Sequence, residues 1–284
     1  MKTNLRTIQT RYGVFVIDGV QDKKMADALA RDTYPNEQLL AVTRQFVTKE
    51  STVLDIGAHI GTFALPMMKE AKEVIAFEPS PEASALLIRN AKENNAPIRI
   101  ITKALGSKQG SGTLLVRNAS NAGANTLVSG GDIPVVTLDS IVAHADFIKI
   151  DVEGMELEVL RGAAKLIETA RPVILFEVNL SQLRAHGTSP RALEHFFITR
   201  GYRLYVPLED KNRSFARVYS MTLLTAFIAP RAWLLFGDSA PFDLVAVPSE
   251  RELPRSPLGF TTALIAAFKR NIMGKVHRMR SWVR

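Results

Sequence analysis

One stretch of the chain decides the fold: Val53-Leu54-Asp55-Ile56-Gly57-Ala58-His59-Ile60-Gly61. An apolar run of strand length leads through two glycines into a helical pattern at residues 62–71. Glycine permits a positive φ and a close approach of the backbone to a ligand, and the helix start presents free amides. The pattern therefore predicts a ligand-binding turn, although a tight turn that binds nothing would have the same sequence.

The next predicted strand ends on an acid. Val74-Ile75-Ala76-Phe77-Glu78-Pro79 follows the turn at about the separation that Rossmann-like domains use to place a carboxylate on ribose hydroxyls. Glu78 is therefore predicted to bind a ribose. The alternative interpretation is a solvated acid before a helix that Ser80 caps.

The spacing of the glycines separates two classes of cofactor. A dinucleotide fingerprint is Gly-x-Gly-x-x-Gly, but this turn has Gly57-x-x-x-Gly61 with Asp55 at the end of the strand. A carboxylate there suits the ammonium group of a methionine moiety and would repel a pyrophosphate. S-adenosylmethionine is therefore the predicted cofactor. The sequence also has no Gly-x-x-x-x-Gly-Lys-Ser/Thr loop, which argues against hydrolysis of a nucleoside triphosphate.

Short apolar runs alternate with helical patterns from residue 52 onward, which is typical of a parallel sheet with crossover helices. We expect an α/β fold with a doubly wound, mostly parallel sheet of seven strands, at residues 53–56, 74–77, 98–102, 147–150, 172–178, 202–206 and 243–247. This Rossmann-like domain spans residues 49–250.

Further segments flank and interrupt the domain. Residues 1–48 are predicted to form an N-terminal helical cap, with one strand at 13–17 and helices at 23–31 and 36–46. A hairpin is expected at 106–131, and a lid-like insertion at 208–241, where loops of this length are commonly functional. The insertion contains an apolar run at 221–236 that is too short to span a bilayer. It would close a pocket, contact a second subunit or a membrane, or complete the core.

The positive charge is a property of the C-terminal tail. Of the net charge of +8, residues 251–284 carry eight Lys and Arg against one acid, or +7, which leaves +1 for the rest. A nearly neutral body argues against a nucleic-acid partner. Apolar residues at helical spacing predict a basic amphipathic helix over 260–284. This helix would lie on an anionic membrane surface, or pack on the protein itself or on a second copy in a homo-oligomer.

The chain has no cysteine, so thiolate zinc sites and cysteine nucleophiles are excluded. Its first residues lack the apolar core of a signal peptide, and no run of about 18 apolar residues is present. We therefore expect a cytoplasmic protein, with peripheral membrane binding as the alternative that the tail suggests.

Four further runs carry a family resemblance. Residues 135–141, Phe147-Ile148-Lys149-Ile150-Asp151-Val152-Glu153-Gly154-Met155-Glu156, residues 159–163 and residues 172–178, with the two motifs above, resemble the FkbM family of methyltransferases. The resemblance covers about residues 52–205. It implies a class I methyltransferase fold, S-adenosylmethionine as methyl donor, and O-methylation of a sugar or natural-product hydroxyl. One departure is His59, where family members often have Asn.

The predicted cofactor-binding residues follow from these motifs and are Asp55, Gly57, Ala58, His59, Gly61, Glu78, Pro79 and Asp151. Asp151 and Glu153 come directly after a buried strand, at the edge where open α/β sheets bind ligands, and are the candidate general bases for the acceptor hydroxyl. Their alternative role is to cap the following helix.

Two further assignments stay open. His186 is a second candidate base, because the ordinary pKa of histidine lies near neutrality. Asp151, Glu177 and Asn179 carry the oxygen ligands that magnesium prefers, but a metal-dependent reaction is the less favoured version.

We therefore expect an S-adenosylmethionine-dependent O-methyltransferase that acts on a sugar, a glycan, including a lipid-linked one, or a related small molecule. One alternative is an RNA or protein methyltransferase, although Asp151-Val152-Glu153-Gly154 is not the Asn/Asp-Pro-Pro-aromatic turn of many nitrogen methyltransferases. The other is a non-catalytic, membrane-associated protein that binds S-adenosylmethionine.

Overall fold

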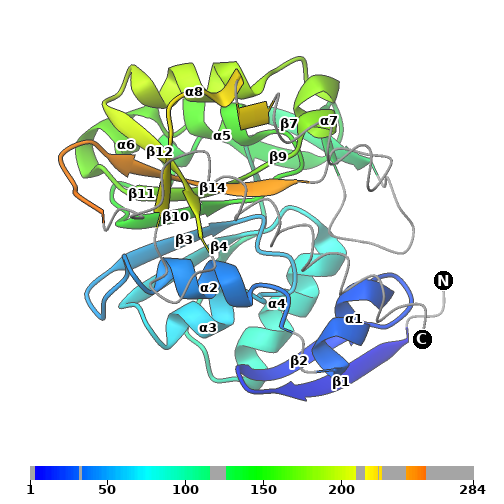
Figure 1. The fold of residues 1–284 in the computed structure, drawn as a ribbon. Coiled ribbons are helices and arrows are strands. Elements are labelled where there is room, and N and C mark those ends of the chain that lie inside the picture. Colours follow the sequence, from blue (N-terminus) through cyan, green and yellow to red (C-terminus); the bar gives the residue numbers. More distant parts are fainter. Residues whose placement is uncertain are drawn as a thin grey trace. The chain divides into compact units, whose positions relative to one another are not determined.

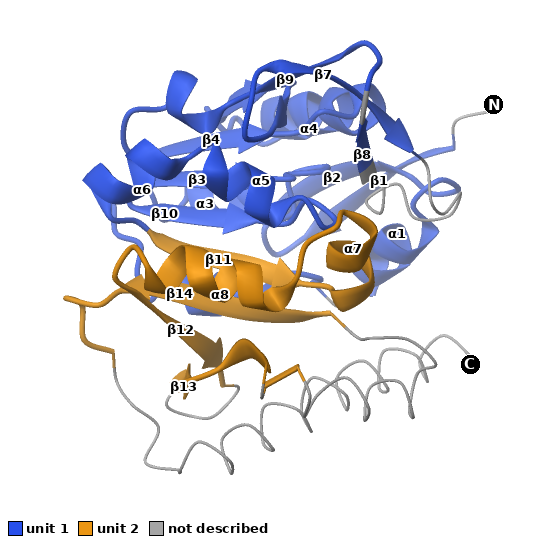
Figure 2. Ribbon diagram, turned by 90° about the horizontal axis from the view of Figure 1, so that it is seen from above, with its two compact units in different colours: residues 1–172 blue, residues 173–284 orange. Residues whose placement is uncertain are grey.

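The structure is a computed structural model that describes residues 4–31, 34–115, 126–208, 215–222, 224–225 and 241–253. The chain divides into two compact units, Met1–Pro172 and Val173–Arg284, which Figure 2 shows in blue and orange.

The N-terminal unit is built on four parallel strands, which are β3 (Thr52–Ile56), β4 (Glu73–Phe77), β5 (Arg99–Ile101) and β10 (Phe147–Ile150) (Figure 1). Their spatial order is β10-β3-β4-β5. The chain thus runs outward from β3 to β5 and then returns to the opposite side of β3. This reversal places the ends of β3 and β10 side by side, at the kind of switch point where open α/β sheets bind ligands.

Helices lie between these strands and after the last of them. They are α3 (Ala64–Met68), α4 (Pro81–Glu93), the 3-10 helix η2 (Leu138–Ser140), α5 (Glu156–Arg161) and α6 (Ala164–Ala170). Helix α4 begins with Pro81 after the N-cap Ser80, whose hydroxyl accepts a hydrogen bond from the Ala83 N–H at 3.3 Å. The Ser80 cap weighed from the sequence is therefore present, directly after Glu78.

A hairpin precedes the sheet. β1 (Leu5–Thr10) and β2 (Gly13–Asp18) pair antiparallel, and α1 (Lys23–Ala30) and α2 (Glu37–Thr43) follow. The two helices match the prediction, but the expected helical cap is corrected to a hairpin with two helices. The sequence did not reveal β1 because only Ile8 and Thr10 of this strand are buried, so its apolar signal is weak.

The insertion predicted at 106–131 contains the expected hairpin. β7 (Gly110–Leu115) and β8 (Thr126–Ser129) pair antiparallel and join β6 (Ala104–Leu105) and β9 (Ile133–Val136) in a separate small sheet of order β6-β9-β7-β8.

The C-terminal unit contains β11 (Val173–Val178), α7 (Leu180–Ala185), α8 (Pro190–Ile198), β12 (Tyr202–Pro207), β13 (Phe215–Val218) and β14 (Phe242–Pro248). Its strands pair antiparallel in the order β13-β12-β14-β11. All seven predicted strands are present, but the prediction of seven mostly parallel strands is corrected. An eighth strand, β13, lies inside the insertion, and the strand pairs of this unit are antiparallel, a direction that apolar runs do not encode.

Most of the lid-like insertion and of the tail lies outside the described residues. Of 208–241, the structure describes β13 and a few neighbouring residues, of which Met221 and Leu224 are buried. The predicted tail helix at 260–284 falls wholly beyond residue 253. In the described ranges, no helix is long and apolar enough to cross a membrane.

Candidate functional site

A cavity of about 210 Å³ lies at the carboxyl ends of β3, β4 and β10. Every residue that lines it belongs to the N-terminal unit. The predicted residues Gly57, Ala58, His59, Glu78, Pro79, Asp151 and Glu153 are in its wall, together with Met25, Asn36, Thr62, Phe63, Lys103, Ala104, Leu105, Leu114, Leu127, Lys149 and Met155.

The glycine turn approaches the end of β10 closely. Gly57 has φ +80°, and a Cβ on it would lie 1.9 Å from the carbonyl oxygen of Asp151, so only glycine fits between the two strand ends. The N–H groups of Gly57 and Ala58 both donate to the Phe77 carbonyl at 3.0 Å. Gly61 has φ +94° and does not line the cavity. A Cβ there would meet the Leu87 side chain at 2.7 Å, so Gly61 serves the packing of the turn on α4.

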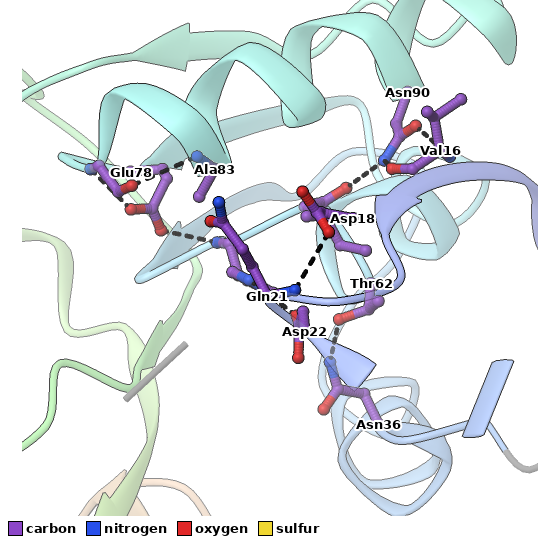
Figure 3. A network of polar contacts seen from close by, with 12 residues as sticks. Val16, Asp18, Gln21, Asp22, Asn36, Thr62, Glu78, Ala83 and Asn90 are labelled. Carbon is purple, nitrogen blue, oxygen red and sulfur yellow. Dashed lines mark hydrogen bonds and ion pairs between the residues drawn. The ribbon is translucent and has the colours of Figure 1, made fainter. Parts of the chain in front are cut away.

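Glu78 joins the two loops that follow β3 and β4. Its Oε2 accepts from the His59 N–H and its Oε1 from the Ser80 N–H, both at 2.8 Å, and only 7% of the residue is exposed (Figure 3). Burial raises the pKa of Glu78. Each carboxylate oxygen keeps further acceptor capacity beyond its one amide bond. The carboxylate is thus fixed in the cavity wall with room to accept from two hydroxyl groups.

A buried lysine in the wall of the cavity links three groups. Lys149 Nζ lies 3.1 Å from Asp55 Oδ1, 3.2 Å from the Gly57 carbonyl oxygen and 3.6 Å from Asp151 Oδ2. Although burial opposes its charged form, the carboxylates of Asp55 and Asp151 raise the pKa of Lys149 above its ordinary value. Lys149 therefore remains a cation that holds the ends of β3 and β10 together.

This geometry changes the role expected of Asp55. The side chain is fully buried and does not line the cavity, and the cation beside it is Lys149 instead of a methionine ammonium. Asp55 thus acts through Lys149, as part of the support of the turn.

Asp151 and Glu153 both face the cavity. Glu153 has φ +54° and His59 has φ +51°. This left-handed backbone conformation costs non-glycine residues free energy, and residues that adopt it cluster at functional sites.

Gly154 follows Glu153 at φ +102°, and its N–H donates to Glu156 Oε1 at 3.1 Å. The carboxylate of Glu156 therefore stabilises the turn that presents Glu153. Glu156 and Asn36 were not predicted as site residues. Glu156 comes directly before the buried Leu157, and an acid at such a position does not by itself signal a turn of this kind.

The remaining candidates lie in the C-terminal unit. His186 is the C-cap of α7, directly after its last residue. Asn179 is its N-cap, and Asn179 Oδ1 accepts from Ser181 Oγ at 2.8 Å and from the Gln182 N–H at 3.4 Å. Neither residue, nor Glu177, is in the wall of the cavity. Within the described part of the chain, no three His, Asp or Glu side chains gather as metal ligands do. The roles suggested for these residues stay predictions.

Glu156 provides a prediction about pH. Burial raises its pKa from 4.5 to about 7. Between these values the unfolded chain releases the proton that the folded chain keeps, so stability falls as pH rises and levels off above pH 7. We expect Glu156→Gln to remove this slope, a difference of roughly 3 kcal/mol by pH 8. Urea unfolding from pH 4.5 to 8 measures it, with Glu158→Gln on the same helix as the control. Parallel curves for Glu156→Gln and the wild type would contradict the assignment.

The chain is similar in sequence to known methyltransferases. The sequence model of the methyltransferase FkbM domain matches residues 55–204. The hexuronic acid methyltransferase AglP of Haloferax volcanii is 27% identical over a match that covers 51% of this chain and 63% of that protein. The methyltransferase sdnD of Sordaria araneosa is 28% identical, over 39% of this chain and 59% of that protein. The chain thus spans about three fifths of the length of these relatives.

Among solved structures, the methyltransferase FkbM from Methylobacillus flagellatus is 17% identical with a TM-score of 0.41. The match covers 70% of this chain and 44% of that one.

Proposed function

Because the chain belongs to the FkbM family of methyltransferases, we propose that it transfers a methyl group from S-adenosylmethionine to a hydroxyl oxygen of a carbohydrate or a related small molecule. The observation that carries the donor assignment is Glu78. Its buried carboxylate lies in the cavity wall between the glycine turn and the start of α4, with both oxygens oriented by backbone amides. Vicinal ribose hydroxyls are the donors that such a carboxylate accepts.

The order of the strands orients the proposed donor. With the ribose at Glu78, directly after β4, the adenine would lie toward Ala104 and Leu105, which follow the neighbouring strand β5. The amino-acid end would then lie toward Gly57 and Asp151, at the ends of β3 and β10. The close approach of the backbone at Gly57 and the apolar residues at the other end fit a ligand with a charged amino-acid group at one end and a base at the other.

The chemistry requires alignment and a base. S-adenosylmethionine supplies a methyl group on a cationic sulfur, which departs as a neutral thioether. The chain has to hold the acceptor hydroxyl in line and accept its proton, and alignment accounts for much of the rate in such a displacement. Asp151 and Glu153 are the carboxylates in the cavity wall that can take the proton, and Lys149 fixes Asp151 through a contact of 3.6 Å.

Two observations support a carbohydrate acceptor. The relative from Haloferax volcanii is named a hexuronic acid methyltransferase. The nearly neutral charge of residues 1–250 offers little attraction for nucleic acid. A lipid-linked glycan and a membrane contact rest on the tail, beyond the described residues, and stay predictions.

The donor assignment is tested by Glu78→Gln. An amide cannot accept from both the His59 and the Ser80 N–H groups, and it loses the charge that strengthens the ribose hydrogen bonds. We expect the affinity for S-adenosylhomocysteine, measured by calorimetric titration, to fall about 10- to 100-fold. Glu73→Gln, at the exposed opposite end of the same strand, is the matched control and should bind as the wild type does. Unchanged affinity in Glu78→Gln would refute the placement of the ribose.

A further inference from the structure

The segment before the family domain contributes to the cavity. The match to the family begins at residue 55, yet Met25 on α1 and Asn36 at the start of α2 line the same cavity as the glycine turn. Nothing in the family match assigns these residues a role. The segment before the family domain therefore forms part of the cavity wall.

Three side chains fasten this segment to the glycine turn. Asp22 Oδ2 lies 3.1 Å from His59 Nε2, and the Tyr34 hydroxyl donates to the Thr62 carbonyl at 2.7 Å. Asn36 Nδ2 donates to Thr62 Oγ1 at 2.9 Å (Figure 3). The contacts reach both His59 and Thr62, on either side of Gly61. The turn is therefore held from the N-terminal segment as well as from the sheet.

The hairpin is anchored to the same region. Asn90 of α4 is fully buried, and its side chain accepts from the Val16 N–H at 2.7 Å and donates to the carbonyls of Val16 at 3.1 Å and Ile60 at 3.0 Å. One amide thus ties β2, α4 and the glycine turn together. These bonds fix the hairpin, and at its turn Tyr12 and Arg11 each contact Glu37, the residue after Asn36, at 2.9 Å.

The side chain of Asn36 has unused hydrogen-bonding capacity. Its Nδ2 is engaged by Thr62, but within the described ranges Oδ1 has no hydrogen-bond partner, and the side chain makes no capping bond to α2. Thr62 follows β3, on the side of the cavity where the amino-acid end of the donor lies in the proposed function. A carboxamide can accept from an ammonium and donate to a carboxylate, the two groups found at that end.

We propose that Asn36 is a donor-binding residue that hydrogen-bonds to the amino-acid end of S-adenosylmethionine, so that the segment before the family domain completes the donor site. This inference rests on the proposed function, because it requires the donor to lie in this cavity. The segment would add to the matched residues 55–204 one part of the cavity wall and one hydrogen bond to the donor.

A pair of ligands isolates the contact. S-adenosylhomocysteine has the amino-acid group, whereas 5′-methylthioadenosine has the same nucleoside and sulfur without it. In calorimetric titrations of the full chain, we expect Asn36→Ala to lower the affinity for S-adenosylhomocysteine about tenfold and to leave that for 5′-methylthioadenosine unchanged. Asn36→Ser, which retains a small polar group, should show the same selectivity with a smaller loss. Gln38→Ala, at an exposed position of α2, is the matched control.

The other outcomes are distinct. An equal loss for both ligands would overturn the proposal, because Asn36 would then act only by supporting Thr62. No loss for either ligand would overturn it as well. If the wild type itself binds neither ligand, the proposed function fails, independently of Asn36. Thermal unfolding of each variant confirms that the chain is folded in the titrations.

Discussion

Replacing Lys149 with methionine is expected to lower the free energy of unfolding by about 3 to 5 kcal/mol, the cost of leaving a buried charge without its partner. Asp55 is fully buried, and Lys149 Nζ at 3.1 Å is the cation beside it. Native domains have only about 5 to 15 kcal/mol of stability, so the variant should be close to unfolding. Urea unfolding at pH 7 measures the change.

A second substitution separates the lost partner from lost packing. In the double variant Asp55→Leu with Lys149→Met, neither charge remains, and apolar replacement of a buried ion pair is often neutral or stabilising. We expect the double variant to recover most of the loss. A double variant no more stable than Lys149→Met alone would show that the ion pair is not what the single substitution disturbs.

The second large effect concerns catalysis. Replacing both Asp151 and Glu153, as Asp151→Asn with Glu153→Gln, should lower kcat about 10²- to 10⁴-fold, the usual contribution of a positioned general base. Both carboxylates lie in the cavity wall, and both substitutions keep the shape of the side chain. Steady-state rates of methyl transfer, with calorimetric titration of S-adenosylhomocysteine, measure the loss of rate separately from donor binding.

The single variants identify the base. The residue whose replacement alone reproduces the loss of the double variant takes the proton, while the other has a supporting role. Glu93→Gln, an exposed acid on α4, is the control for charge removal. Wild-type rates in the double variant would remove both carboxylates from the mechanism and leave the fold unaffected.

Sequence alone reveals the part of the site that depends on local pattern. Buried parallel strands are continuous apolar runs, so β3, β4 and β10 and the acids that follow them could be placed. The close approach at Gly57 requires glycine and is therefore visible in the sequence. β1 was missed because few of its residues are buried, and β13 because it is a run of only four residues inside a long insertion.

The supports of the site depend on pairing between distant segments, which local pattern does not contain. Lys149 meets Asp55 because β10 pairs with β3 in a parallel register that sets these two residues opposite each other, 94 positions apart. Asn36 likewise meets Thr62 across 26 positions of the chain. Glutamate is also not a residue that signals a left-handed backbone, so the conformation of Glu153 could not be anticipated.

The proposed function requires methyl transfer from S-adenosylmethionine to a sugar hydroxyl in this cavity. The most direct measurement incubates the protein with S-adenosylmethionine that carries a ¹³C-labelled methyl group and with uronic acid glycosides, neutral glycans, RNA and protein, and locates the label by NMR. We predict a labelled methyl ether on a sugar hydroxyl, formed by the wild type and not by the double variant Asp151→Asn with Glu153→Gln. Label on RNA, protein or a carboxyl group, with none on a sugar hydroxyl, would contradict the account.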